Sequence, residues 1–420
     1  KVINDNSVNG EDHNQDNESE LFFSDYQWQH KFLELDAVFT TGTTNEIVYA
    51  RSDLFQGDNF RQNNAFFTQI DKKIGKLNLS FGGRYEYFKV RSEQKYLING
   101  DSINTYQNAK PVFRAGLNYQ IAEATYIRSS WGEGFRFPSM AEMFISTNYS
   151  GIEIYANPEL KPETGWSTEI GIKQGLKIGN WMGFIDAATF LMEYDDMMEF
   201  NFGAWGEIVN YSVDPISNEI LVEGVGFKSV NVGETRVSGI EFSFTGHGDI
   251  NSDVGINILA GYTYMNTKAL DPHSIYYENT YFAASDGMII DTITEYLTYN
   301  NSSSDTSVLK YRYKHIAKLD AELTYKKFSL GTSLRYNDFM KNIDAAFVSP
   351  LLAGYIPDIV ESRNKFIDGD FIVDFRTSYQ LNSITKISLI VNNLLNREYM
   401  TRPANMMPPR TIALQCNMKI

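Results

Sequence analysis

The chain has 420 residues, of which 43% are hydrophobic and 14% aromatic, and its formal net charge is −15. This acidic balance argues against a nucleic-acid partner, because phosphate contacts need clustered lysine and arginine. The single cysteine, Cys416, excludes an intramolecular disulfide. No apolar run is long enough for a transmembrane helix, and the polar residues 1–20 lack the apolar core of a signal peptide.

The dominant pattern along the chain is a period of two in hydrophobicity. Near the C-terminus, Ile412, Leu414 and Met418 alternate with small or polar residues, which is typical of a strand with one apolar face. Similar alternation predicts about fifteen strands, with cores near residues 21–30, 32–42, 63–72, 76–90, 110–120, 124–132, 165–175, 183–199, 236–247, 253–265, 310–325, 328–338, 370–381, 384–393 and 409–420.

The connections between these strands alternate between short and long. Short turns are expected near residues 31, 73–75, 121–123, 175–180, 248–252, 326–327 and 382–383. Long loops are expected at 43–62, 91–109, 133–164, 200–235, 266–309, 339–369 and 394–408. This asymmetry and the strand lengths are typical of outer-membrane barrels and unlike a soluble sandwich. We therefore predict an all-β transmembrane antiparallel barrel with short periplasmic turns and long extracellular loops.

One connection has a distinctive sequence. It contains the runs Phe135-Arg136-Phe137-Pro138-Ser139 and Asn157-Pro158-Glu159-Leu160-Lys161-Pro162-Glu163. Pro138 interrupts strand pairing, and Asn157-Pro158 and Lys161-Pro162 favour turns before the next strand. Taken singly, each of these residues is explained by the shape of the loop alone.

As a set, these residues resemble the TonB-dependent outer-membrane receptors, whose sequences show Gly-Phe-Arg-Ala-Pro-Ser and then Asn-Pro-x-Leu-Lys-Pro-Glu. Phe137 stands here in place of the alanine. Two further segments are similar to the family, namely Ser238-Gly239-Ile240-Glu241, and residues 392–399 followed by Pro408-Pro409-Arg410. The resemblance covers nearly the whole chain, although the family usually ends on an aromatic residue and this chain ends on Ile420.

The resemblance implies a 22-stranded barrel with a globular plug. Residues 1–420 would then be a partial barrel domain of about fifteen strands without the plug, and residues 1–20 the end of an extracellular loop. An odd strand number also indicates a fragment, because closed single-chain bacterial barrels have even numbers.

The function that the resemblance implies is active uptake of an extracellular ligand across the cell outer membrane. A ferric siderophore or similar iron complex is the expected ligand, by its frequency in the family. The expected partners are outer-membrane lipid, that small molecule, and the inner-membrane TonB complex acting through a plug absent from this chain, with the barrel monomeric. A passive porin-like channel and a surface binding or adhesion module are the alternatives. No catalytic motif has persuasive context, so no enzyme is expected.

Aromatic residues of the long loops could stack on a ligand or form an interfacial girdle, and the sequence leaves both open. The candidate ligand contacts are Arg136, Tyr149, Tyr155, Trp205, Tyr211, Tyr276 and Tyr277. Some family members bind haem through a histidine between the two motifs, whereas here only Tyr155 could serve. The scattered histidines predict no metal or cofactor site, and loop irregularity explains Met400, Met406 and Met407 more simply than Cu(I) binding.

Overall fold

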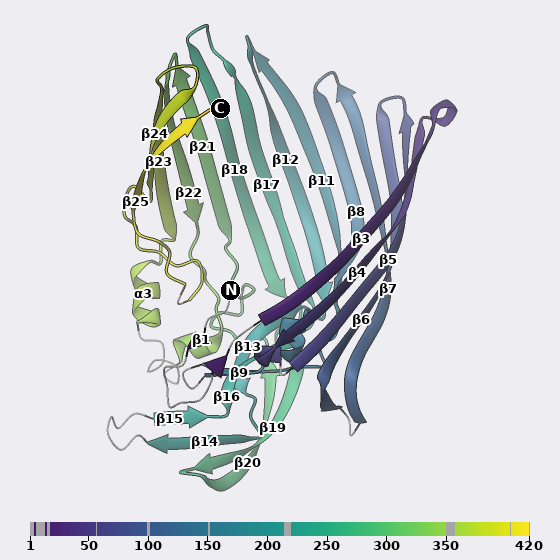
Figure 1. Ribbon diagram of the computed structural model, residues 1–420, viewed down its shortest axis with the longest axis vertical. Helices are drawn as coiled ribbons and strands as arrows, with labels where there is room; N and C mark the ends of the chain where they lie inside the picture. The colour runs from purple at the N-terminus through teal and green to yellow at the C-terminus, as the bar shows by residue number, and fades with distance from the viewer. Residues whose placement is uncertain are drawn as a thin grey trace.

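The computed structural model describes residues 4–5, 13–14, 17–55, 57–98, 101–149, 152–213, 220–349, 358–403 and 405–419. Its main feature is a 15-stranded antiparallel sheet that curves into most of a barrel wall (Figure 1). The wall strands, in spatial and chain order, are β3 (Asn17–Phe32), β4 (Ala37–Ser52), β5 (Gly57–Ile74), β6 (Leu77–Ile98), β7 (Asp101–Ala122), β8 (Thr125–Arg136), β11 (Glu163–Ile178), β12 (Trp181–Asp195), β17 (Thr235–Asp249), β18 (Val254–Ala269), β21 (His315–Tyr325), β22 (Phe328–Asn337), β23 (Asp370–Gln380), β24 (Thr385–Asn392) and β25 (Thr411–Met418).

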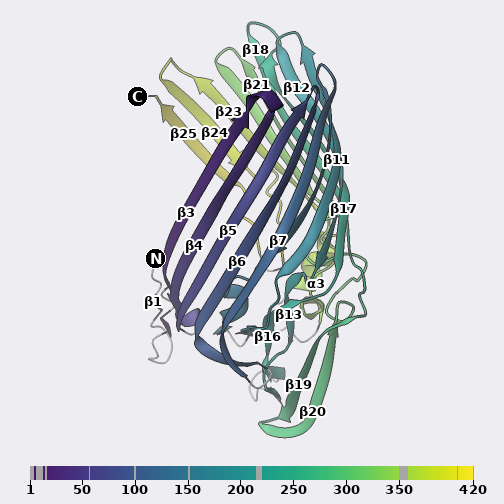
Figure 2. The same ribbon diagram turned by 90° about the vertical axis from the view of Figure 1, so that its right-hand side faces the viewer.

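The fifteen strands predicted from alternation are the fifteen strands of this wall. β3 and β25 stand at the two ends of the strand order, and Figure 2 shows them on the same side of the molecule. The prediction of an all-β antiparallel barrel wall is therefore confirmed. The total of 22 strands stays a prediction.

The two faces of the wall differ in polarity, as the alternation predicts. On β11, Ile170 and Ile172 are exposed on the outer face. Glu169 directly precedes Ile170 and faces inward, where its Oε1 accepts a hydrogen bond of 2.8 Å from Arg128 Nε. Arg128 Nη1 also donates to Asp186 Oδ2 at 2.8 Å. The same kind of inward ion pair recurs at Arg84–Glu86, Arg236–Glu193 and Arg376–Asp320. An apolar outside and an ion-paired inside suit a wall with lipid around it.

The short turns lie at one end of the wall, and several use left-handed backbone positions. Gly75 and Lys326 have φ values of 58° and 52° in two of these turns. The first turn is not near residue 31, as predicted, but at the 3-10 helix η1 (Leu33–Leu35) and Asp36, whose φ is 45°. Phe32 pairs with Ala37, so the first strand continues past the turn position predicted near residue 31. The apolar Leu33 and Leu35 obscured this turn in the sequence pattern.

Two predicted long loops are mostly strand, which corrects the boundaries drawn at 43–62 and 91–109. β4 continues to Ser52 before the 3-10 helix η2 (Asp53–Phe55), and β6 and β7 extend to Ile98 and from Asp101. The backbone ladder continues where apolar residues follow one another, as in Ile47-Val48-Tyr49, so a period of two no longer reveals it. The strand predicted from residue 310 is shorter than expected, because β21 begins at His315.

The long connections contain strands and helices that the sequence pattern did not predict. They build two four-stranded sheets at the loop end of the wall, in the orders β13-β16-β10-β9 and β15-β14-β19-β20. Their strands are β9 (Thr147–Tyr149), β10 (Ile152–Tyr155), β13 (Met198–Ala204), β14 (Ile208–Val213), β15 (Ile220–Glu223), β16 (Val225–Asn231), β19 (Ile275–Ser285) and β20 (Met288–Thr298). The remaining elements are β1 (Asn4–Asp5), β2 (His13–Asn14), α1 (Met140–Phe144), η3 (Ala345–Val348) and α3 (Ile359–Lys365). None of the helices described here is long and apolar enough to cross a membrane.

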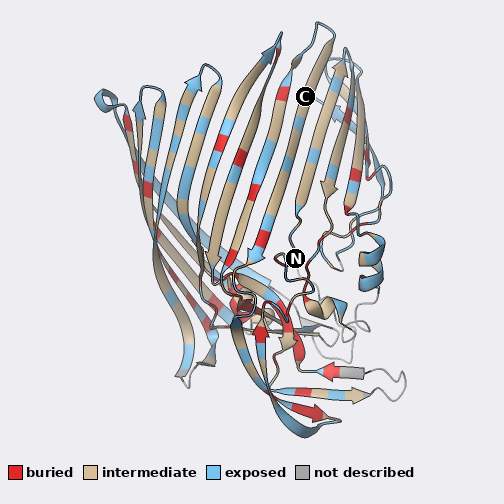
Figure 3. Ribbon diagram, turned by 180° about the vertical axis from the view of Figure 1, so that it is seen from behind, coloured by how far each residue is buried: buried red, intermediate tan, exposed pale blue. Residues whose placement is uncertain are grey.

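Parallel strand pairs tie the loops to one another. β10 pairs in parallel with β16, and β14 pairs in parallel with β19. Buried residues concentrate in this loop region (Figure 3). One packed cluster contains Trp205, Leu297 and Tyr299, and another contains Phe88, Met143 and Leu160. The wall turns its apolar side chains outward, so a dry protein core forms where the loops pack on each other.

Candidate functional site

A cavity of about 620 Å³ lies among the loops at the long-loop end of the wall. This volume falls in the usual range of ligand pockets. Five connections contribute to its lining, which includes Ala141, Glu142 and Ile145 near α1, Met198, Glu199 and Phe200 of β13, Phe227 and Ser229 of β16, the run Lys310-Tyr311-Arg312, Phe347 of η3, and Arg402 and Pro403.

Three phenylalanine rings form an aromatic shelf in this cavity, made of Phe200, Phe227 and Phe347. The centroids of the Phe200 and Phe227 rings are 5.0 Å apart with an interplanar angle of 10°. The Phe347 ring lies 5.9 Å from Phe227 at 33°. Phe200 remains 43% exposed, so one ring of the shelf keeps open surface. Such a shelf can stack on a flat or aromatic part of a ligand.

Two exposed arginines lie beside the shelf, and the charge of one of them, Arg312, also acts on the buried Glu199 carboxylate. Arg312 and Arg402 form no ion pair with a carboxylate in the described part of the chain. Arg312 Nη1 donates a long hydrogen bond of 3.4 Å to the Tyr311 carbonyl oxygen. The Arg402 guanidinium carbon lies 5.9 Å from the centroid of the Tyr311 ring. Both guanidinium groups are therefore free to bind an anionic ligand, which they recognise through paired N–H donors.

Beneath the arginines, a buried charge cluster joins three loops around Lys310. The Lys310 side chain has no exposed surface, and its Nζ donates to Asn201 Oδ1 at 2.5 Å. It also lies 3.4 Å from Glu199 Oε2 and 3.5 Å from Asp344 Oδ2. Burial raises the pKa of Glu199, and the positive charge of Lys310 opposes that rise. Asp344 Oδ2 accepts a further hydrogen bond of 3.2 Å from the Phe202 backbone N–H. The floor of the cavity is thus fixed by charges from separate loops.

The first motif residues brace the loop after β8. Arg136 Nη1 is 2.7 Å from Glu142 Oε1, and Arg136 Nη2 is 3.7 Å from Glu163 Oε2. Ser139 and Glu142 form a capping box at the start of α1, which explains why α1 begins after Pro138. Burial raises the pKa of Glu142, but hydrogen bonds from the Ser139 backbone and the Arg136 guanidinium outweigh it and hold that pKa below its usual range.

The second motif fastens this loop onto β16. The buried Asn157 donates from Nδ2 to the Ser229 carbonyl oxygen at 2.8 Å. The Lys161 backbone N–H donates to Asn231 Oδ1 at 3.0 Å. Leu160 is fully buried in the cluster around Met143, and Pro138 and Pro162 are buried as well. Pro158 is half-buried and lies between these anchors in sequence. In the first motif, the centroid of the Phe135 ring lies 4.9 Å from that of the Phe137 ring. These contacts support the interpretation of the motif as a loop-shaping element.

The aromatic residues proposed as ligand contacts lie elsewhere. Trp205, with 8% exposure, meets the Tyr277 ring edge-on at 5.0 Å, and Asn201 Nδ2 donates to the Tyr276 hydroxyl at 2.8 Å. Tyr155 packs against the same core. Tyr211 is exposed on β14, and the side chain of Tyr149 is outside the described part of the structure. Arg136 lines a separate cavity of about 400 Å³. None of the six residues other than Tyr149 lines the 620 Å³ cavity, and the role of all seven in ligand contact stays a prediction.

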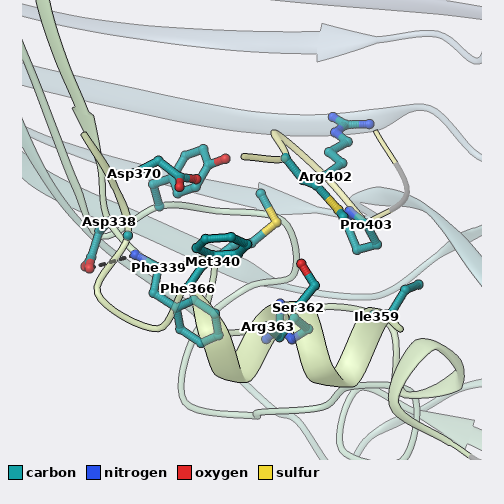
Figure 4. A pocket seen from close by; sticks show the side chains of 13 residues that line it. Asp338, Phe339, Met340, Ile359, Ser362, Arg363, Phe366, Asp370, Arg402 and Pro403 are labelled. Atoms are coloured by element: carbon teal, nitrogen blue, oxygen red, sulfur yellow. Dashed lines mark hydrogen bonds between the residues drawn. The ribbon is translucent and has the colours of Figure 1, made fainter. Parts of the chain in front are cut away.

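The cavity residues Phe200, Arg312 and Arg402 were not predicted. The run Lys310-Tyr311-Arg312-Tyr313-Lys314 is a sequence signal for Arg312 alone, because basic and aromatic residues alternate there, and no such signal marks Phe200 or Arg402. A second pocket beside α3 is much smaller, about 70 Å³. It shares Arg402 with the larger cavity, but Figure 4 shows the Arg402 guanidinium pointing away from the α3 side chains Ser362 and Arg363.

Comparison with protein families gives one match that spans most of the chain. The family model described as TonB dependent receptor-like, beta-barrel matches residues 3–394. Among curated proteins, the chain is 21% identical over 216 residues to the hemoglobin and hemoglobin-haptoglobin-binding protein A of Haemophilus influenzae, covering 49% of this chain and 19% of that protein. It is 35% identical over 74 residues to the vitamin B12 transporter BtuB of Vibrio vulnificus, covering 18% of this chain and 10% of the transporter.

Solved structures share the fold. The copper transporter OprC superposes with a TM-score of 0.64 at 13% identity, covering 98% of this chain and 58% of that one. The siderophore receptor PiuA from Acinetobacter baumannii gives a TM-score of 0.63 at 15% identity, covering 97% of this chain and 57% of that one. The chain therefore spans less than one fifth of these curated relatives and somewhat over half of these solved chains.

Proposed function

Because this chain belongs to the TonB-dependent receptor β-barrel family, whose barrels lie in the outer membrane of Gram-negative bacteria, we propose that it is the wall and loop region of an uptake receptor. The ligand that we propose is a ferric siderophore or a similar anionic iron complex. Movement of the ligand would be driven by the inner-membrane TonB complex acting on a plug.

The pair of exposed arginines beside the aromatic shelf, neither of which forms a salt bridge in the described part of the chain, carries this proposal. Arg312 and Arg402 would bind anionic oxygens of an iron complex, and Phe200 would stack on its organic part. Tyr311 lies between the two charges and contacts Arg402. A neutral ligand would leave both guanidinium groups without a partner, so the site favours a ligand with net negative charge.

Binding and uptake by the full-length gene product test the proposal. We expect the double variant Arg312→Gln/Arg402→Gln to bind a radiolabelled ferric siderophore at least about tenfold more weakly, since each charge-assisted hydrogen bond contributes about 1.5–3 kcal/mol. Arg51→Gln is the matched control, because Arg51 is 71% exposed, pairs with Asp58 and is not among the residues that line the cavity. Catecholate, hydroxamate and citrate complexes of iron are compared with cobalamin and haem.

Dependence on TonB separates this function from its alternatives. Uptake should disappear in cells that lack TonB, while binding at the surface persists. Uptake that survives loss of TonB would indicate a passive channel. Cell adhesion without transport of any tested ligand would indicate a surface binding module.

A further inference from the structure

Among the residues that the structure describes, no strand pairs with the second edge of β20 in the hairpin of β19 and β20. In the order β15-β14-β19-β20, β20 is the last strand of its sheet. Figure 2 shows this hairpin extending beyond the loop end of the wall. Its tight turn at Asp286-Gly287 has φ values of 47° and 79°, which fit a two-residue hairpin turn. β20 therefore presents the unpaired side of an 11-residue strand away from the wall.

The exposed side of β20 is unusually apolar for a sheet edge. Met288, Ile289 and Ile290 are 71%, 59% and 66% exposed. Natural sheets usually protect such edges with lysine, proline or a covering element, because an open edge can pair with another strand. β20 contains neither lysine nor proline, and its one irregularity is a register shift against β19 at Ile290, between Ile289 and Asp291. An edge of this kind is suited to binding an extended segment of another protein.

The base of the hairpin is firmly anchored, so the edge is held in a fixed position. Leu297 and Tyr281 are 5% and 8% exposed and belong to the two packed clusters of the loop region. A preformed edge binds a strand with a smaller loss of conformational entropy than a mobile loop would.

The charge of this sheet indicates what kind of segment would bind. Residues 208–213, 220–223 and 275–298 contain no lysine or arginine. They contain five acidic residues, which are Glu223, Glu278, Asp286, Asp291 and Glu295. A binding segment with lysine or arginine would complement this charge, whereas an acidic segment would be repelled.

We propose that β20 is a docking edge for an extended, basic segment of an extracellular protein. The segment pairs with β20 through backbone hydrogen bonds, covers Met288, Ile289 and Ile290 with apolar side chains, and places lysine or arginine near Asp291 and Glu295. A second copy of this receptor fits less well, because pairing β20 with itself would bring like charges together. This interaction is separate from ligand binding at Arg312 and Arg402.

The test uses the full-length receptor in detergent and synthetic peptides of 11 residues, the length of β20. One peptide alternates valine and lysine, a second alternates valine and glutamate, and a third is the valine–lysine peptide with every backbone amide N-methylated, so that neither of its edges can donate a backbone hydrogen bond. We expect only the first to bind and to slow hydrogen exchange in residues 288–298. The variant Met288→Ser/Ile289→Ser/Ile290→Ser should bind the valine–lysine peptide at least tenfold more weakly, because it loses the apolar contacts with the peptide. Its fold should be retained, because these three side chains are exposed.

The matched control is Val348→Ser/Val360→Ser, which removes exposed apolar side chains from other loops and should bind the peptide normally. Equal binding of the N-methylated peptide would overturn the proposal, because attraction would then be electrostatic only. Unchanged binding to the triple serine variant would also overturn it. Dimerisation of the receptor that is lost in the triple serine variant would replace the proposed partner with a second copy. Siderophore uptake by the triple variant should remain normal, which keeps this test independent of the uptake function.

Discussion

Replacing Lys310 with methionine should loosen the loops that form the cavity. Methionine keeps much of the side-chain volume but removes the Nζ that lies 3.4 Å from Glu199 Oε2 and 3.5 Å from Asp344 Oδ2. Both carboxylates are nearly inaccessible, with side-chain exposures of 12% and 2%. Removing one partner of a buried ion pair costs about 3–5 kcal/mol, because the remaining charge stays buried without compensation. Local opening should therefore become about 10² to 10³ times more frequent.

Hydrogen exchange on the full-length receptor measures this effect. In Lys310→Met, faster exchange is expected in residues 198–204 and 299–311, while wall strands such as β11 and β12 keep their protection. The triple variant Lys310→Met/Glu199→Gln/Asp344→Asn should recover most of the protection, because no buried charge is left unpaired. The reasoning is refuted if the single variant exchanges like the natural protein, or if the triple variant is as labile as the single one.

Three further predictions concern the loop braces and the wall. The lowered pKa of Glu142 means that its contribution to stability is complete above the ordinary carboxyl pKa and is lost as pH falls through the lowered value, so protection of residues 137–149 should decline in acid. Glu142→Gln should remove that pH dependence, and an unchanged pH profile would contradict the assignment. Gly226→Ala should increase proteolysis of the loop after β8, because a Cβ at this position collides with the Glu153 carbonyl oxygen. Gly134→Ala is the control, since no atom lies within 4 Å of its Cβ position. Ile240→Arg on the lipid face should cost about 2–4 kcal/mol of barrel stability in denaturant titrations, whereas Ser243→Arg on the inner face should cost little, and equal losses would refute the assigned faces.

The wall could be predicted from sequence because the polarity of its side chains alternates with the same period of two residues as the strand backbone. Ile240, Phe242 and Phe244 face lipid, while Glu241 and Ser243 between them face the interior. This contrast between an apolar outer face and a polar inner face is expected only in the part of the wall that spans the membrane. Beyond it, β4 and β5 continue as a ladder of mixed apolar and polar residues, in which Ile47, Val48 and Tyr49 are consecutive and Arg51 pairs with Asp58 at 2.6 Å. Strand pairing there depends on backbone hydrogen bonds, which leave no hydrophobic pattern.

The cavity could not be predicted because its residues come together through contacts between loops. The run Lys310-Tyr311-Arg312 alternates in polarity and was therefore predicted to be part of a strand. In the structure Tyr311 has a φ of 59°, and this left-handed conformation interrupts an extended backbone. Trp205 and Tyr276 were proposed as ligand contacts from their residue type alone. Whether such an aromatic residue packs in a core or faces a ligand depends on its neighbours, and Asn201, 75 residues away in sequence, is the neighbour that fixes Tyr276.

The parallel pairing of β10 with β16 also sets an order of assembly. Glu153 pairs with Gly226, so the loop after β8 can reach its final shape only after β11, β12 and β13 have been placed. Hairpins of the wall join neighbouring segments, whereas this contact must first close a long stretch of chain, and such non-local contacts form slowly. The outer surface of the receptor is therefore expected to mature last, on a wall that is already in place. A wall that is fully inserted but still unable to bind ligand would be the intermediate to look for in time-resolved refolding.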